Sequence, residues 1–131
     1  MRMHSRRSFL CLIGAAPAAF AVPARAFEFQ PYDPAAVEKA IASGKPVVVH
    51  VRAWWCLQCH AQANILDSLK SDPAYNEVSF FLVDYDKQKD VVAKLDCPRA
   101  TLIAYRSGKE VKRMSWETSR DAVVGVLKAA V

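Results

Sequence analysis

Residues 46–60 read Pro46-Val47-Val48-Val49-His50-Val51-Arg52-Ala53-Trp54-Trp55-Cys56-Leu57-Gln58-Cys59-His60. The first half of this stretch is almost continuously apolar, which predicts a strand from Val47 to Arg52 that is buried on both faces. The second half holds two cysteines spaced Cys-x-x-Cys, and the residues after them predict a helix from Ala61 to Lys70. A buried strand, a short turn, a cysteine pair and a helix therefore follow one another directly, and they decide the fold.

This order of elements suits dithiol–disulfide exchange. A cysteine at a helix N-terminus lies where unpaired N–H groups and the helix macrodipole stabilise a thiolate, so Cys56 is predicted to be the nucleophile. Cys59 lies one turn along the same helix face, and it is predicted to resolve the mixed disulfide that Cys56 forms. Trp55 is expected to pack beside the pair and shield it, and Trp54 is expected to pack in the core.

Other interpretations of the motif remain open at this point. Cys-x-x-Cys-His is also the attachment signature of a c-type haem, so Cys56, Cys59 and His60 fit an electron-transfer protein as well. The pair also fits a structural disulfide in a non-catalytic binding module. A structural zinc is not expected, because the sequence has no second Cys-x-x-Cys and no histidine pair to complete four ligands.

The segment from Lys45 to Cys59 resembles the first core strand and the active-site turn of thioredoxin-fold oxidoreductases. The likeness continues in residues 80–86, which are similar to the second core strand, and in residues 101–110, which are similar to the hairpin strand and its turn. It covers about Pro34 to Val131. The resemblance implies an α/β thioredoxin-like fold with a mixed central β-sheet flanked by helices. It also implies a thiol–disulfide oxidoreductase with no bound cofactor and no metal.

The sequence departs from this family at two positions. His50 stands where thioredoxins usually carry a buried acidic residue that takes the proton of the resolving cysteine. A neutral imidazole can do the same, so His50 is a third candidate catalytic residue, with core packing as the alternative. Ala100 stands where the family has a cis-proline. Because a cis bond before a non-proline residue costs about 3–4 kcal/mol, we expect a trans Arg99–Ala100 bond, and we also expect a trans Cys97–Pro98 bond.

The resemblance places the substrate contacts at Trp55 and in the loop formed by Arg99, Ala100 and Thr101. With the loop altered, Arg99 is expected to present its guanidinium beside Cys56 and to favour acidic or carbonyl-rich client segments. The two residues between the cysteines are uncharged, which favours a moderate redox potential over that of a strong oxidant. We expect a reductant rather than an oxidant. Cys97 is expected to be a small buried apolar residue rather than a third redox partner.

Residues 1–26 predict a secretory signal peptide that is cleaved after Ala26. They combine an arginine-rich start, an apolar core at residues 9–20 and an A-x-A cleavage site at residues 24–26. Residues 5–10 further resemble a twin-arginine export signal. We therefore expect a periplasmic protein whose substrates are protein thiols and disulfides, and whose cysteines are recycled by a membrane or periplasmic redox partner.

Cleavage would leave residues 27–131 as one thioredoxin-like domain. The whole chain has 131 residues and a formal net charge of +5, from 18 basic and 13 acidic residues. Four of the basic residues and none of the acidic ones lie in residues 1–26, so the mature chain is close to neutral. Because it has no basic patch, we expect no nucleic-acid partner, and we expect a monomer.

The rest of the sequence predicts alternating helices and strands. Besides the two elements above, helices are expected at residues 34–42, 87–95 and 119–130, and strands at residues 78–83, 101–105 and 110–114. Residues 27–33 are expected to be extended, and the strand at 78–83 to run parallel to Val47–Arg52. Asp33 is the predicted N-cap of the first helix, and Ser107-Gly108 the predicted turn of a hairpin.

Overall fold

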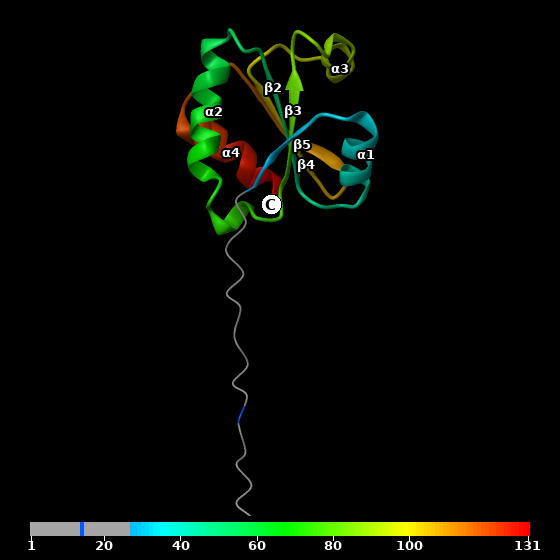
Figure 1. Cartoon of the computed structure of the whole chain (residues 1–131), viewed down its shortest axis with the longest axis vertical. Coiled ribbons are helices and arrows are strands. Elements are labelled where there is room, and N and C mark those ends of the chain that lie inside the picture. The colour runs from blue at the N-terminus through cyan, green and yellow to red at the C-terminus, as the bar shows by residue number, and fades with distance from the viewer. Residues whose placement is uncertain (1–13, 15–26) are drawn as a thin grey trace, which may run out of the picture.

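The computed structural model describes residue 14 and residues 27–131 (Figure 1). The predicted signal peptide at residues 1–26, with its twin-arginine motif and its cleavage site after Ala26, lies outside the described residues except for Gly14. Every helix and strand of the described part falls between Phe29 and Ala130.

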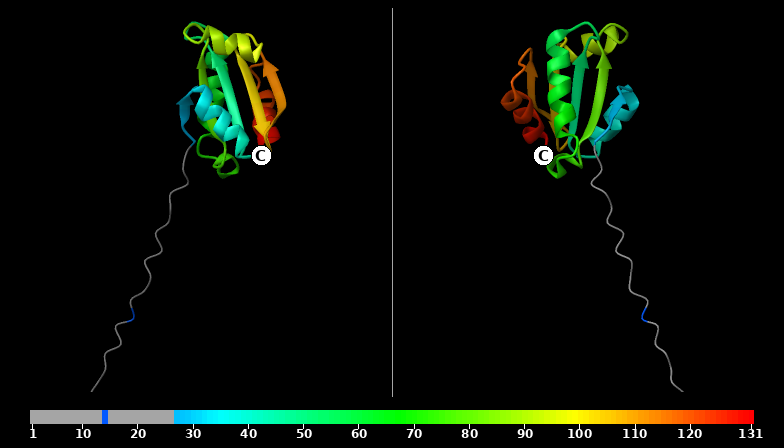
Figure 2. Two further views of the ribbon diagram at one scale, coloured as in Figure 1. Left: turned by 90° about the vertical axis from the view of Figure 1, so that its right-hand side faces the viewer. Right: turned by 60° about the vertical axis from the view of Figure 1, so that its left-hand side comes forward.

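A five-stranded mixed sheet forms the middle of the molecule (Figure 2). Its strands are β1 (Phe29–Pro31), β2 (Val47–Arg52), β3 (Ser79–Asp84), β4 (Thr101–Arg106) and β5 (Lys109–Ser115). Their spatial order is β1-β3-β2-β4-β5, so β2 is the central strand. β3 runs parallel to β1 and β2, as predicted for β2, whereas β4 pairs antiparallel with β2 and β5.

Two pairs of helices cover the two faces of the sheet (Figure 1). α1 (Pro34–Ala42) and α3 (Lys89–Leu95) lie on one face, and α2 (Leu57–Leu69) and α4 (Arg120–Ala130) lie on the other. A short 3-10 helix, η1 (Pro73–Tyr75), was not predicted. The predicted mixed sheet flanked by helices is confirmed. Within the described residues no helix is long and apolar enough to cross a membrane.

The central strand is buried on both faces, as its apolar sequence predicted. Val48 packs with Leu66 and Phe80 in the core under α2 and α4. Val49 and its neighbours Val47 and Val51 pack in the core under α1 and α3. This alternation follows the two-residue period of a strand. Because both helix layers pack on β2, the position of its C-terminal end is fixed, and so is the start of the chain segment that follows it.

Side-chain caps set where the helices begin. Asp33 accepts a hydrogen bond from the Ala36 N–H at the start of α1, as predicted. α2 begins at Leu57, so the predicted start at Ala61 is wrong by one turn. The reason is that Cys56 is itself the N-cap, since the Cys59 N–H donates to Cys56 Sγ at 3.2 Å. The other predicted helices and strands begin and end within two residues of the observed ones.

Candidate active site

The cysteine pair lies where β2 ends and α2 begins. Cys56 is 2% exposed and Cys59 is 1% exposed, and the cysteines of the described residues are free thiols. Both side chains pack in a small cluster with Ala53 and Ala100, against which Tyr85 also packs. The fold therefore brings the predicted nucleophile, the predicted resolving cysteine and the loop before β4 into contact.

The two thiols have different surroundings. The Cys59 N–H donates to Cys56 Sγ, so the Cys56 sulfur is held at the N-terminus of α2. Burial raises the pKa of Cys59 to about 11, and the hydrogen bond with Cys56 adds to that rise. The backbone groups of Ala53 and Ala100 act in the opposite direction. The arrangement suits an attacking Cys56 and a Cys59 that ionises later.

The two tryptophans before Cys56 occupy different environments. Trp55 donates from Nε1 to Asp86 Oδ2 at 2.9 Å, which fixes its ring next to the cysteine pair. Trp54 is 79% exposed, so the predicted core position of Trp54 is wrong. The physical reason is that β2 ends at Arg52, so Trp54 lies beyond the sheet and neither helix layer covers it.

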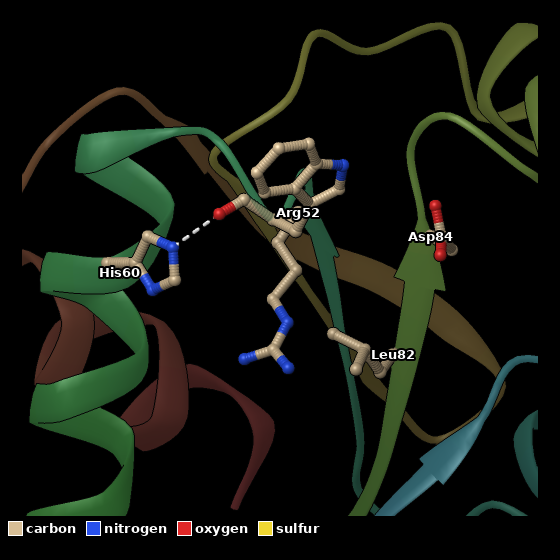
Figure 3. A pocket seen from close by; sticks show the side chains of 5 residues that line it. Arg52, His60, Leu82 and Asp84 are labelled. Atoms are coloured by element: carbon tan, nitrogen blue, oxygen red, sulfur yellow. Dashed lines mark hydrogen bonds between the residues drawn. The ribbon is translucent and has the colours of Figure 1, made fainter.

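A pocket lies between α2 and β3 (Figure 3). Its lining residues are Arg52, Trp54, His60, Leu82 and Asp84. The exposed ring of His60 hydrogen-bonds the backbone carbonyl oxygen of Trp54 rather than either cysteine. His60 therefore ties the first turn of α2 to the preceding chain on the outside of the site.

The loop before β4 has an unusual backbone. Within the described residues there is no cis peptide bond, so the predicted trans bonds at Cys97–Pro98 and Arg99–Ala100 are confirmed. Ala100 instead adopts a left-handed conformation with φ 57°, and Trp116, directly after β5, has φ 70°. Each such conformation costs a non-glycine residue roughly 1–2 kcal/mol. The two residues are joined, because the Trp116 N–H donates to the Ala100 carbonyl at 2.9 Å.

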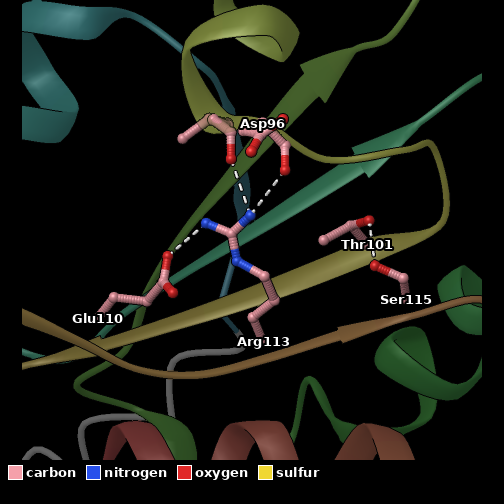
Figure 4. Close-up of polar contacts among 6 residues, drawn as sticks. Asp96, Thr101, Glu110, Arg113 and Ser115 are labelled. Atoms are coloured by element: carbon pink, nitrogen blue, oxygen red, sulfur yellow. Dashed lines mark hydrogen bonds and ion pairs between the residues drawn. The ribbon is translucent and has the colours of Figure 1, made fainter.

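Hydrogen bonds from β4 and β5 hold both ends of this loop (Figure 4). Arg113 Nη1 donates to the carbonyl oxygens of Leu95 at 2.8 Å and Asp96 at 3.1 Å, where α3 ends. Thr101 Oγ1 donates to the Pro98 carbonyl at 2.7 Å and accepts from the Ser115 hydroxyl at 2.8 Å. The loop is thus held by side chains of the hairpin where the family uses a proline ring.

The Arg99 guanidinium contacts two indole rings at once. Its Cζ lies 4.6 Å from the ring centre of Trp55 and 4.7 Å from that of Trp116, so both rings make cation–π contacts. The expected position of Arg99 beside Cys56 stays a prediction. The Arg99 Nε is buried and has no hydrogen-bond partner among the described residues. Trp116 was not predicted to be a site residue, because its only signal in the sequence was its place immediately after the hairpin.

His50 on β2 and Gln62 on α2 form a buried polar pair. His50 is almost completely buried, and burial lowers its pKa to about 4, so its imidazole is neutral at physiological pH. Its Nε2 lies 3.0 Å from Gln62 Oε1. Gln62, also buried, donates to the carbonyl oxygens of Ala100 at 3.0 Å and Glu117 at 2.9 Å. Gln62 was not predicted to be a site residue, although its place three residues after Cys59 puts it on the same helix face.

Cys97 is half-buried rather than fully buried. It packs against the core under α1 and α3, beside Leu95 and Tyr105, and burial raises the pKa of its thiol. It lies outside the cluster formed around Cys56 and Cys59. These contacts agree with the expected apolar role.

Comparison with known proteins gives one consistent result. The family model for thioredoxin matches residues 29–129. The chain is 37% identical over 79 residues to thioredoxin-2 of Saccharomyces cerevisiae, covering 59% of this chain and 74% of that protein. The crystal structure of Trxlp from Edwardsiella tarda is 40% identical, has a TM-score of 0.72, and covers 76% of this chain and 98% of that one. The structure of Fasciola hepatica thioredoxin is 28% identical with a TM-score of 0.64, covering 74% of this chain and 93% of that chain.

The burial of His50 predicts a pH dependence of stability. With a pKa of about 4 in the folded protein and 6.5 when unfolded, His50 binds a proton more readily in the unfolded chain. Stability should therefore fall as the pH drops from 6.5 to 4, by roughly 3 kcal/mol from this group. His50→Gln should remove that part of the pH dependence, whereas His60→Gln, at an exposed position, should keep it.

Urea denaturation of the three proteins between pH 4 and pH 7 measures the effect. Carboxylates titrate in the same range, so the informative quantity is the difference between the wild-type and His50→Gln curves. Parallel curves for these two proteins would contradict the burial of a neutral imidazole.

Proposed function

The chain belongs to the thioredoxin family, and on this premise we propose that it works in the periplasm as a reductant of protein disulfides. Family membership makes it a thiol–disulfide oxidoreductase that acts on the thiols and disulfides of proteins. The observation that carries the proposal is the buried pair at the start of α2, in which only the uncharged Leu57 and Gln58 stand between the cysteines and burial keeps Cys59 a thiol.

Membership of the thioredoxin family argues against the two alternative interpretations of the motif, a c-type haem protein and a non-catalytic binding module. A c-type haem needs both cysteines and His60 on one open side of the chain. Here the cysteines are buried, whereas His60 is exposed and bonded to the Trp54 carbonyl. A non-catalytic module would keep its cysteines as a permanent disulfide, which does not fit an oxidoreductase.

The proposed reaction has two exchange steps. The Cys56 thiolate attacks one sulfur of a client disulfide, a bond forms from Cys56 to the client, and the other client sulfur leaves as a thiolate that takes up a proton. Cys59 then loses its proton and attacks Cys56 Sγ, which releases the second client thiol and leaves a Cys56–Cys59 disulfide. Two electrons pass from the protein to the client.

His50 is the proposed acceptor of the Cys59 proton. Its Nε2 is engaged with Gln62, so the proton would be taken at Nδ1. Because the pKa of His50 is about 4 and that of Cys59 about 11, the proton would not stay on the imidazole but would pass on to solvent or to the leaving thiolate. In this proposal His50 therefore passes the Cys59 proton on and does not retain it.

The surroundings of the pair support the proposed reducing direction. A strongly oxidising site needs a dithiol form that is stabilised, usually through a strongly favoured thiolate. Leu57 and Gln58 add no charge between the cysteines, the Arg99 guanidinium contacts indole rings, and burial disfavours charge on Cys59. These features favour the disulfide over the dithiol, so the dithiol is a good electron donor.

The periplasmic location rests on the sequence of residues 1–26. Arg6-Arg7 and the A-x-A site at residues 24–26 support export, by the twin-arginine route in this proposal. A reductant in an oxidising compartment must be re-reduced, so a membrane or periplasmic redox partner has to supply electrons to the Cys56–Cys59 disulfide. We propose that the mature protein does this work as a monomer.

Client binding is proposed at the surface formed by Trp55, Arg99 and Trp116. Ala100 and Thr101, which were expected to contact the substrate, are completely buried, so they support this surface from below and do not form part of it. Trp55 and Trp116 are partly exposed, and the half-buried Arg99 contacts both of their rings. No carboxylate of the described residues forms an ion pair with Arg99. Its guanidinium is therefore available to a client carboxylate, which favours disulfides flanked by Asp or Glu.

Trapping experiments test the division of labour between the cysteines. Cys59→Ser should accumulate mixed disulfides with client proteins, because Cys56 still attacks and nothing resolves the product. Cys56→Ser should accumulate none. Non-reducing gel electrophoresis after incubation with oxidised insulin measures both, and wild-type protein with dithiothreitol should reduce the insulin. Equal trapping by the two variants would refute the assignment.

The client preference of Arg99 can be measured with a pair of disulfide peptides. Arg99→Gln should lower kcat/KM by roughly five- to tenfold for a peptide with glutamates beside the disulfide, because a charge-assisted hydrogen bond is lost. A peptide with glutamines at those positions should be affected less than twofold. Arg52→Gln, which changes an exposed arginine in the pocket of Figure 3, should affect neither. Equal losses for both peptides would show that Arg99 does not read the client charge.

A further inference from the structure

Gln62 connects four parts of the site from inside the core. It is completely buried on α2, one turn after Cys59, and each polar group of its side chain has a partner. Its amide nitrogen donates to Ala100 in the loop before β4 and to Glu117 after β5, and its Oε1 faces His50 on β2. The helix that carries the cysteines is thus joined to the central strand and to both loops beside the site.

The orientation of the amide follows from these partners. Two backbone carbonyl oxygens can only accept, so the atom that faces them must be the NH₂ group, and both of its hydrogens are used. Oε1 is then left for His50, and it also can only accept. The neutral imidazole must therefore carry its proton on Nε2, and Nδ1 is left unprotonated.

Gln62 also holds the two left-handed residues. Ala100 and Trp116 have positive φ although neither is glycine, and one hydrogen bond joins their backbones. Gln62 binds the carbonyl of Ala100 and the carbonyl of Glu117, the residue that follows Trp116. Arg99 directly precedes Ala100, and its guanidinium contacts the ring of Trp116. A change at Gln62 should therefore be transmitted to the proposed client surface.

We propose that Gln62 is a positioning residue that shapes the client surface by holding Ala100 and Glu117, and that selects the Nε2–H tautomer of His50. This inference deepens the proposed function and rests on it. Gln62 itself does not touch the reacting sulfur atoms in this assignment. It stands in for the rigidity that a proline at position 100 would give the loop.

Two variants and a matched control test the proposal. Gln62→Leu removes all of the hydrogen bonds, whereas Gln62→Glu keeps the acceptor for His50 but loses at least one of the two donors. Asn64→Leu is the control, because it removes an exposed amide two residues further along the same helix. Two rates are compared for each protein: reduction of a protein disulfide, which needs the client surface, and reaction with a small aromatic disulfide, which needs only the Cys56 thiolate.

In both Gln62 variants, KM for the protein disulfide should rise roughly tenfold, because the loops lose buried hydrogen bonds, while the rate with the small disulfide stays within about twofold. Asn64→Leu should change neither rate. An unchanged KM, or an equal loss of both rates, in Gln62→Glu would overturn the role in shaping the surface. Should Gln62→Leu fail to fold, Gln62→Glu decides by the same comparison.

The tautomer is tested on the wild-type protein and needs no variant. Long-range ¹H–¹⁵N NMR of His50 at pH 7 should show a protonated Nε2 and a bare Nδ1. The opposite tautomer would overturn this part of the assignment. The outcomes also separate this inference from the proposed function: a wild-type protein that reduces no protein disulfide refutes the function, whereas normal turnover with the wrong tautomer or an unaffected Gln62 variant refutes only the role of Gln62.

Discussion

The complete burial of residues 47–51 of β2 is the constraint on which the rest of the structure depends. Its valines are inaccessible from either face, and helices close both layers above them. A charge in this strand would have to be desolvated, which is why His50 is neutral. The same packing fixes where the strand ends, so that Cys56 lies at the N-terminus of α2 as its N-cap. The chemistry of the pair is thus a consequence of where a buried strand stops.

The loop opposite the cysteines shows how hydrogen bonds replace a covalent restraint. Without proline at position 100, the chain runs through trans bonds and a left-handed Ala100. That conformation is unfavourable by itself, and it persists because neighbouring groups over-determine it. Arg113 and Thr101 hold the ends of the loop, and Gln62 and the Trp116 N–H hold its last carbonyl. The result brings Arg99 against two tryptophans at the rim of the site.

Local sequence patterns were sufficient for the elements and insufficient for the contacts between them. The apolar run at 47–51, the Asp33 cap and the Ser107-Gly108 turn act through neighbours in sequence, and each was predicted correctly. Gln62 binds partners that are 12 to 55 residues away, and Trp116 contacts Arg99, which is 17 residues away. Nothing near either residue in the sequence signals those contacts. Trp54 was misplaced because its hydrophobicity predicts burial, whereas its position beyond the end of β2 leaves it exposed. The start of α2 was missed because cysteine is an uncommon N-cap.

The central claim is that this buried, uncharged environment makes the cysteine pair a reductant, and its reduction potential tests that claim most directly. Equilibration of the purified protein with glutathione redox buffers, followed by separation of the dithiol and disulfide forms, gives the potential. Our account predicts a reduction potential near that of reducing thioredoxins, about −270 mV, which is more negative than the potential of the glutathione buffer. A value near −120 mV, typical of a strong oxidant, would contradict it.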